Sequence, residues 1–401
     1  MRNRLHHVRP EAGRASEAHC LHGGPLFDGQ RYHPEGHVII EHGRIAAAKP
    51  GSPGPSVRSS QDVQGRLIAP GFVDLHCDAL EKCIELRPGA RFDHGFALEN
   101  LDRRLAACGV TSFCHAVAFL DTEMGLRRPE TAADIVRSIG EFAESGRALV
   151  KHGAHIRFEV GSLDSAAVIR TLLRHNLSRL FSVMDHSPGQ GQFKSMESFL
   201  HYYAETYAIS VEEAERIGGE RSAQRGHAWE DSLELLEEVR MSELPILSHD
   251  DDTADKVSMV KDLGATGCEF PVSLEAARQA REFGMTICMG APNLLRGRST
   301  NGNVTAAEVL QSGHCDVLVS DYAPESLLQG PFYAQQSLGL DLAEVLASTT
   351  VNPGALLQPG SGGPGRLTVG APADVIVLDT SPPWVRVWET WVDGRRVYAA
   401  H

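Results

Sequence analysis

Eight apolar, strand-like runs alternate with helical stretches between residues 67 and 350, and this alternation constrains the fold more than any other feature of the chain. In order, the runs read GFVDLH, VTSFCHAVAF, HIRFEV, RLFSVMDH, LPILSHD, TGCEFPV, MTICMGAP and DVLVSD. Stretches of helical periodicity, such as DSAAVIRTLLRHN and LEAARQAREFG, lie between them. Strands that alternate with helices indicate an α/β fold with a parallel sheet, and eight strands predict a (β/α)8 TIM-like barrel. A doubly wound sheet is the alternative that this count leaves open.

The segments on both sides of the predicted barrel have a different sequence pattern. Residues 19–66 contain short strands broken by glycines, as in antiparallel hairpins, and residues 351–401 return to glycine-rich turns and short strands. We expect these segments to form one small β-sandwich domain from both chain ends, beside a barrel over residues 67–350. Residues 1–18 are polar and lack a pattern, which predicts a poorly ordered tail.

Composition limits the compartment and the partners. No window holds the 18 apolar residues that a membrane helix needs, and the N-terminus lacks the apolar core of a secretory signal. The eight cysteines are scattered, as reduced core residues are, so we expect a cytoplasmic protein that does not bind a membrane. The formal net charge of −14 argues against a nucleic-acid partner but leaves room for a local pocket that binds an anionic small molecule.

Side chains that can bind metals stand where the predicted strands end. They are His76, Asp78, Glu159, His186, His249 with Asp250, and Asp321. The carboxyl ends of barrel strands form the active face, and imidazoles with carboxylates suit zinc, manganese or iron. Two ions a few ångströms apart would need about this many ligands plus a bridging carboxylate. A single such residue is more often a helix cap, but five endings in strand order favour a metal centre.

The motif APGFVDLHCD, the ordered His, Glu, His, His and Asp endings and the tail GRLTVGAPADVIVLD resemble the amidohydrolase superfamily. These are metal-dependent hydrolases with a (β/α)8 barrel and a flanking β-sandwich. The stretches HCDALEKCIELRPGARF, VMDHSPGQGQF, SHDDDT, GAPNLLRGRSTNGNVTA and SDYAPESLL resemble the alpha-D-ribose 1-methylphosphonate 5-triphosphate diphosphatase family of phosphonate metabolism, in the carbon-phosphorus lyase pathway. The resemblance implies release of pyrophosphate from a ribose 5-triphosphate that carries an anomeric phosphonate, by attack of metal-bound hydroxide on phosphorus. The segment GRSTNGN departs from the family pattern G-G-S-H-S-G-N, notably at Thr300, which leaves the exact substrate open.

We assign two divalent metal ions to six ligands: His76, Asp78, Glu159, His186, His249 and Asp321. Glu159 is the expected bridge between the ions, in place of the carbamylated lysine found elsewhere in the superfamily. Lys151 is the alternative, but it stands before its strand rather than at the end. As the resemblance implies, Asp321 would both bind a metal and accept a proton from the attacking water, as a general base does.

Cations and polar groups gather on loops that follow the predicted strands, where they would meet an anionic substrate. The expected substrate-binding residues are Lys82, Arg87, Arg91, Lys194, Asn293, Arg296, Arg298, Ser299 and Asn303. A second possible function is the commoner reaction of the superfamily, cleavage of a C–N bond in a cyclic amide, imide or amidine. A third possibility is a barrel without catalytic activity. Three further histidines, His115, His152 and His155, lie in or next to strands, where we expect core or supporting roles. We also expect a homodimer, because similar barrels are commonly dimeric.

Overall fold

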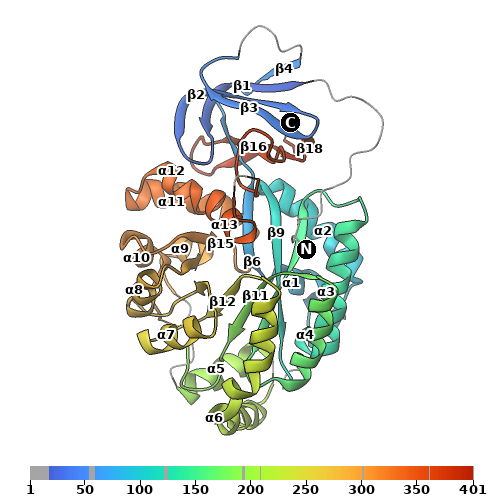
Figure 1. Cartoon of the computed structure of the whole chain (residues 1–401), viewed down its shortest axis with the longest axis vertical. Coiled ribbons are helices and arrows are strands. Elements are labelled where there is room, and N and C mark those ends of the chain that lie inside the picture. The colour runs from blue at the N-terminus through green and yellow to red at the C-terminus, as the bar shows by residue number, and fades with distance from the viewer. Residues whose placement is uncertain are drawn as a thin grey trace.

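The computed structural model describes residues 18–53, 59–121, 125–191, 195–207, 209–299, 302–360 and 362–400. The predicted tail, residues 1–18, lies outside the described residues except for residue 18. Figure 1 shows a barrel wrapped by helices, with a small sheet at one end to which both the blue and the red ends of the chain contribute.

Eight parallel strands form the barrel in sequence order, which confirms the predicted α/β architecture. They are β6 (Phe72–Cys77), β9 (Val110–Phe119), β10 (Lys151–Glu159), β11 (Ser178–Met184), β12 (Ile246–His249), β13 (Gly267–Glu269), β14 (Thr286–Gly290) and β15 (Val317–Val319). The sheet closes where Cys77 pairs with Asp321, and the Asp78 N–H donates to the Asp321 carbonyl at 2.7 Å. Closure therefore brings the HCD motif of the first strand beside the aspartate that follows the last.

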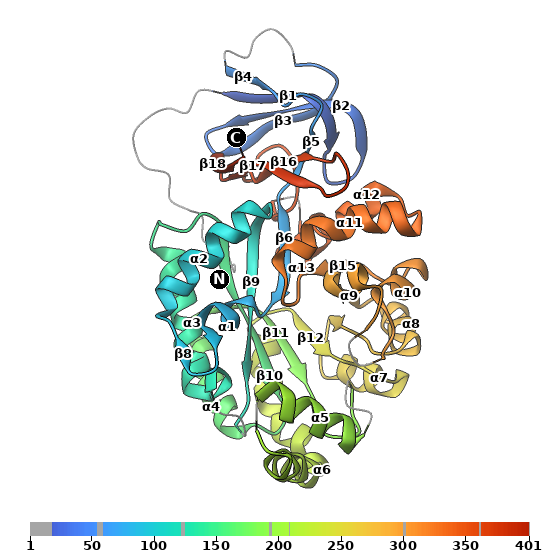
Figure 2. The ribbon, with the colours of Figure 1, turned by 180° about the vertical axis from the view of Figure 1, so that it is seen from behind.

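Helices cover the outer face of the barrel (Figures 1 and 2). They are α2 (His94–Ala107), α3 (Pro129–Glu144), α4 (Leu163–Arg174), α6 (Val211–Met241), α7 (Ala254–Asp262), α8 (Leu274–Glu282), α10 (Ala306–Gln311) and α11 (Pro324–Leu338). Their apolar stripes bury residues such as Leu101, Val136 and Ile169 against the strands. No helix among the described residues is long and apolar enough to cross a membrane.

Short elements complete the connections. They are η1 (Gly125–Arg127), the hairpin β7 (Glu85–Arg87) and β8 (Ala90–Arg91), and the helices α1 (Ala79–Ile84), α5 (Met196–Tyr207), α9 (Ala291–Arg296), α12 (Leu342–Ala347) and α13 (Val351–Leu357). Several helices begin at a side-chain cap that satisfies an otherwise free backbone N–H. The hydroxyl of Thr253 accepts from Lys256 and that of Ser273 from Ala276, so α7 and α8 begin directly after their strand-to-helix loops.

The two chain ends form one sheet with a core of its own. Its strands are β1 (His19–Phe27), β2 (Tyr32–Glu41), β3 (Arg44–Pro50), β4 (Ser59–Asp62), β5 (Leu67–Pro70), β16 (Val375–Asp379), β17 (Arg386–Val392) and β18 (Arg395–Ala399). β5 joins the halves, because it pairs with β1 on one side and antiparallel with β16 on the other. The core between them contains Leu26, Ile68 and Val377. Both chain ends thus contribute to one sheet that is separate from the barrel, as the fold prediction expected.

Lys151 anchors this sheet domain to the barrel. The lysine opens β10, and its Nζ lies 2.7 Å from an oxygen of Asp374 and 2.8 Å from one of Asp393. Its side chain is only 2% exposed. The ammonium group is therefore held at the end of the barrel opposite to the strand ends that carry the predicted metal ligands. In this position Lys151 neutralises two carboxylates at the domain junction.

Candidate active site

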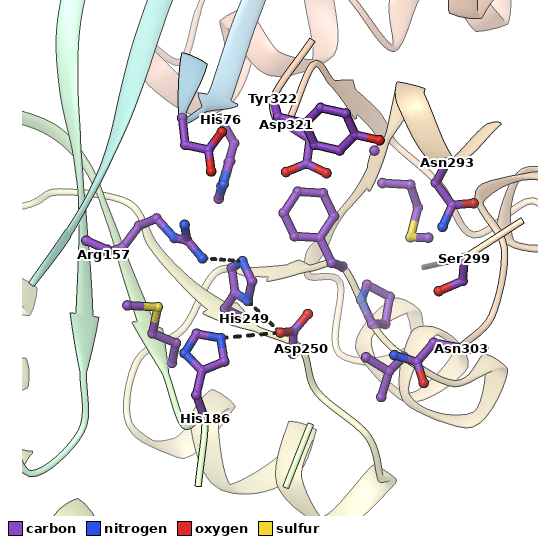
Figure 3. A pocket seen from close by; sticks show the side chains of 18 of the residues that line it. His76, Arg157, His186, His249, Asp250, Asn293, Ser299, Asn303, Asp321 and Tyr322 are labelled. Carbon is purple, nitrogen blue, oxygen red and sulfur yellow. Dashed lines mark hydrogen bonds and ion pairs between the residues drawn. The ribbon is translucent and has the colours of Figure 1, made fainter. Parts of the chain in front are cut away.

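A cavity of about 330 Å³ opens at the carboxyl ends of the barrel strands. Figure 3 shows side chains from several strand ends converging on it. His76, Asp78, His186, His249 and Asp321, all predicted from the sequence, line this cavity. Its volume lies in the range of small-molecule sites, roughly 300–1,000 Å³.

Three non-glycine residues at the rim hold a left-handed backbone. Asp250 and Phe270 directly follow β12 and β13, Asp321 lies two residues after the end of β15, and the three φ angles are +58°, +55° and +58°. Each such conformation costs about 1–3 kcal/mol in a residue with a side chain and persists where the surroundings enforce it. All three side chains line the cavity. Three of the eight left-handed non-glycine residues in the described ranges thus lie at strand ends that line the cavity.

His186, His249 and Asp250 form the group best suited to a metal ion. Asp250 Oδ2 lies 3.1 Å from His249 Nδ1 and 3.5 Å from His186 Nε2. Ligands bound tetrahedrally at about 2.0–2.1 Å are roughly 3.3 Å apart, so the spacing fits. The buried atoms Asp250 Oδ2 and His249 Nδ1 make no hydrogen bond within the described residues. Buried polar atoms rarely remain so, and a divalent cation would satisfy them.

Electrostatics at this group also favour a cation. Burial opposes the charge of His186, but Glu159 and Asp250 outweigh it and raise its pKa to about 9. Burial likewise opposes the charge of Asp250, yet His249 and His186 hold the pKa of that carboxyl well below its usual range. The buried carboxylates thus recruit positive charge, which a proton supplies in the absence of an ion.

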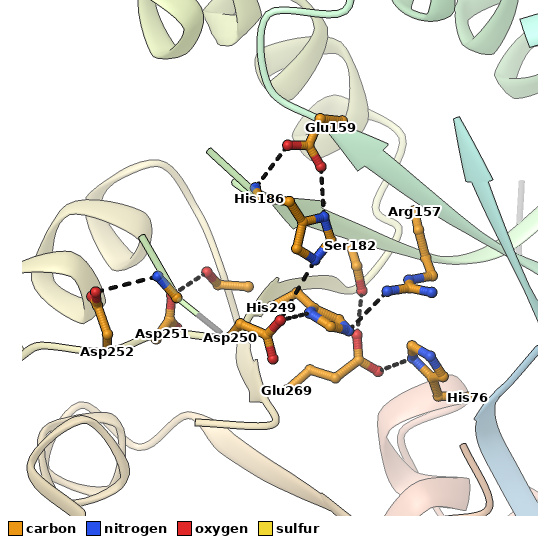
Figure 4. A network of polar contacts seen from close by, with 12 residues as sticks. His76, Arg157, Glu159, Ser182, His186, His249, Asp250, Asp251, Asp252 and Glu269 are labelled. Carbon is orange, nitrogen blue, oxygen red and sulfur yellow. Dashed lines mark hydrogen bonds and ion pairs between the residues drawn. The ribbon is translucent and has the colours of Figure 1, made fainter. Parts of the chain in front are cut away.

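Glu159, which we expected to bridge two ions, lies behind His186 (Figure 4). Its Oε2 contacts His186 Nδ1 at 2.8 Å and its Oε1 accepts the His186 backbone N–H at 2.7 Å. It is not among the residues that line the cavity. Such a carboxylate fixes the ring orientation and tautomer of a metal-binding histidine, so that the other ring nitrogen faces the ion.

A second cluster lies deeper in the barrel, under His76. His76 Nδ1 donates to Glu269 at 2.7 Å, and Ser182 Oγ lies 2.8 Å from the other oxygen of Glu269 and 2.5 Å from His155 Nε2. Burial lowers the pKa of His76 to about 4, so the ring is neutral. In contrast to His249 and Asp250, these atoms already have hydrogen-bond partners. We therefore interpret the cluster as support for His76, with His155 in the supporting role expected for it.

Asp78 and Asp321 face each other across the barrel closure. Burial raises the pKa of Asp78 to about 6 and that of Asp321 to about 7, and the charge of Asp78 adds to the rise at Asp321. The guanidinium of Arg157 acts in the opposite direction on both carboxyls. A carboxyl group with a pKa near neutrality can exchange a proton with a bound water at neutral pH.

Three residues of the site were not assigned from the sequence: Asp250, Glu269 and Arg157. Asp250 directly follows His249, but the six predicted ligands do not include it. Arg157 lies on β10, is 8% exposed and lines the cavity, with Nη2 3.0 Å from His249 Nε2. Glu269 is fully buried at the end of β13. For Arg157 and Glu269 the sequence signal is a charged residue inside an otherwise apolar run, because a buried charge needs a partner.

The structure divides the expected substrate-binding residues. Those that line the cavity are Asn293, Arg296, Ser299 and Asn303. Those that are exposed and outside its lining are Lys82, Arg87, Arg91 and Arg298. Lys194 and the departure at Thr300 lie outside the described residues. Arg296 donates to the Tyr322 hydroxyl at 3.2 Å, so this cation is held at the mouth of the cavity.

Known proteins resemble the chain over nearly its whole length, although no family model matches it. It is 31% identical over 366 residues to the alpha-D-ribose 1-methylphosphonate 5-triphosphate diphosphatase of Escherichia coli (strain K12), an alignment that covers 90% of this chain and 96% of the relative. It is 25% identical to an imidazolonepropionase of Symbiobacterium thermophilum, covering 92% and 91%. The N-acetyl-D-glucosamine-6-phosphate deacetylase of Mycobacterium smegmatis shares the fold, with a TM-score of 0.64 at 16% identity over 94% of this chain and 99% of that one.

Proposed function

Because this chain belongs to the amidohydrolase superfamily, in the family of the alpha-D-ribose 1-methylphosphonate 5-triphosphate diphosphatases, we propose that it hydrolyses a phosphoanhydride. The substrate would be a ribose 5-triphosphate with an anomeric phosphonate, and the leaving group pyrophosphate. The observation that carries the proposal is the buried ligand group His186, His249 and Asp250, which opens on the same cavity as Asp321 and three arginines, Arg127, Arg157 and Arg296.

A divalent metal ion would supply one part of the chemistry. When bound, a divalent ion acidifies water and neutralises phosphoryl oxygens. The residues that would hold one ion of zinc, manganese or iron are His186, His249 and Asp250. The sequence alone predicts two ions, and metal analysis of the loaded protein tests that number. Glu159 would hold His186 in the ligating orientation through the 2.8 Å contact to Nδ1.

The chain's own residues would move the proton and hold the substrate. Asp321 would accept the proton of the attacking water on its carboxylate, and the water oxygen would displace pyrophosphate from phosphorus. Arg296, Asn293 and Ser299 line the cavity, where their donors would hold the charged oxygens of the triphosphate. Few acceptors suit such donors as well as a phosphate chain does.

C–N hydrolysis is the second candidate. The imidazolonepropionase relative acts, by its name, on an imidazolone, and the fold neighbour is a deacetylase. An amide carbonyl could occupy the same place beside Asp321, and Thr300 departs from the diphosphatase pattern. For this function the arginines of the cavity have no evident purpose, so we rank it second.

The two functions can be separated with one purified protein. The enzyme is loaded with manganese, zinc or iron and given tripolyphosphate, nucleoside triphosphates and a panel of cyclic amides and imidazolones. Pyrophosphate release that is absent in Asp321→Asn supports the proposal. Ring opening or ammonia release without pyrophosphate would overturn it in favour of the C–N hydrolase. A homodimer of the 43.5 kDa chain, proposed from similar barrels, is tested on the same sample by light scattering.

A further inference from the structure

Arg157 is a buried cation whose donors are only partly used. One guanidinium nitrogen, Nη2, lies 3.0 Å from His249 Nε2, while Nε makes no hydrogen bond within the described residues. Figure 3 shows the side chain extending from β10 toward the cavity. A guanidinium stays charged in proteins and can only donate. Burying it with unused donors is unfavourable unless an anion arrives to use them.

The charge of Arg157 acts on the side of the cavity formed by Asp78 and Asp321. Its side chain lines the same cavity as these two carboxylates and His76. A cation in this place does electrostatically what a metal ion would do there. It also has the planar fork that binds two phosphoryl oxygens at once.

Ligands for a second ion are not gathered on this side. Within the described ranges, two groups of metal-binding side chains converge: His186 with His249 and Asp250, and His76 with His155 and Glu269. The second group is already joined by hydrogen bonds through His76 Nδ1 and Ser182. His76, Asp78 and Asp321 do not form such a group, although all three line the cavity.

The contact to His249 links Arg157 to the metal group. Because the guanidinium donates, His249 Nε2 accepts, and the proton of a neutral ring is then on Nδ1, toward Asp250. If His249 held an ion through Nδ1, its ring would need the other tautomer, with an N–H facing the guanidinium. Arg157 would then lose its contact with His249, and its donors would be available to a bound anion.

We propose that Arg157 takes the place of a second metal ion: the site binds one divalent ion, at His186, His249 and Asp250, and Arg157 binds the phosphoryl oxygens of the substrate. The identity of that anion rests on the proposed function; the number of ions does not. By this proposal Arg157 is a catalytic residue that touches the substrate, neutralising charge at the phosphoryl group while water attacks.

The number of ions and the affinity for an anion test the inference separately. Wild type, Arg157→Met and Arg157→Lys are loaded with manganese, freed of excess ion and measured for metal per chain. Binding of inorganic pyrophosphate to the loaded proteins is measured by calorimetry. We expect one ion per chain in all three. Because a hydrogen bond to a charged group contributes about 1.5–3 kcal/mol, pyrophosphate binding should weaken about 10- to 100-fold in Arg157→Met and less in Arg157→Lys.

A matched control keeps the result specific. Arg170→Met removes an arginine of α4 that pairs with Glu238 outside the barrel, and it should leave both measurements unchanged. Two ions per chain in wild type, or unchanged pyrophosphate affinity in folded Arg157→Met, would overturn the inference. If Arg157→Met does not fold, the metal content and the pyrophosphate affinity of Arg157→Lys test the inference instead. If the enzyme cleaves amides and not phosphoanhydrides, the proposed function is wrong. The number of ions per chain then still tests whether Arg157 replaces a second metal ion.

Discussion

Replacing Lys151 by methionine tests how the two domains are joined and separates two roles for this lysine. In the structure its ammonium group is shared by Asp374 and Asp393, at 2.7 and 2.8 Å, away from the cavity. In the alternative drawn from the superfamily it would be a carbamylated bridge between metals. The first role predicts a loss of stability with metal binding intact, and the second predicts the loss of bound metal.

The size of the stability loss follows from burial. Lys151 and Asp374 are 2% and 3% exposed, and removing one partner of such a pair costs about 3–5 kcal/mol because a charge is left buried. The unfolding entropy is about 2.1 cal/mol/K per residue, or about 0.8 kcal/mol/K for 401 residues. The expected decrease in Tm is therefore about 4–6 °C. Adding Asp374→Asn to Lys151→Met removes the buried charge and should recover part of the loss.

Calorimetric melting and metal analysis of the loaded protein provide the assay. Lys49→Met, which removes an exposed lysine of the same domain, is the control and should melt within about 1 °C of wild type. An unchanged Tm in Lys151→Met, or a Lys151→Met protein that melts normally but no longer retains metal, would refute the anchoring role.

Three further predictions concern the site. Asp321→Asn should lose about 10²- to 10⁴-fold in turnover while retaining its metal; near-normal pyrophosphate release would contradict the role of proton acceptor. Glu159→Gln should weaken metal affinity about 10- to 100-fold, measured by competition with a chelator, because the carboxylate orients His186 at 2.8 Å; an unchanged affinity would show that this contact is dispensable. Manganese at 100 times its dissociation constant should stabilise the folded protein by about 2.7 kcal/mol, seen as a higher Tm that a chelator reverses. The same addition should leave His249→Ala unchanged, and an equal shift in that variant would place the ion elsewhere.

The barrel could be predicted because its strands are buried on both faces. Such strands appear as continuous apolar runs, and VTSFCHAVAF coincides with β9 from Val110 to Phe119. The long helix α6 was harder to see. Residues 211–228, its first part, are rich in charge and glycine and show no clear apolar stripe. The helix nevertheless begins at a local signal, because the Ser210 hydroxyl accepts the Glu213 N–H as a helix cap does.

The positions of the candidate ligands could be predicted better than their partners. A sequence shows which side chain ends a strand, but it does not show what that side chain meets across the barrel. Glu159 is at the expected strand end, yet it faces His186. Asp250 enters the ligand group because its backbone is left-handed, a conformation that no neighbouring residue signals. Glu269 reaches His76 from 193 residues away, a pairing that only barrel closure creates.

The composite sheet also affects how the chain is synthesised. β5 leaves the ribosome roughly 300 residues before its antiparallel partner β16, and Lys151 appears 223 residues before Asp374. In the interval the nascent chain carries an open strand edge, which is a template for aggregation and a target for chaperones. A chain terminated before Val375 would keep that edge permanently. Without β16, β5 keeps an unpaired edge of the kind that templates aggregation.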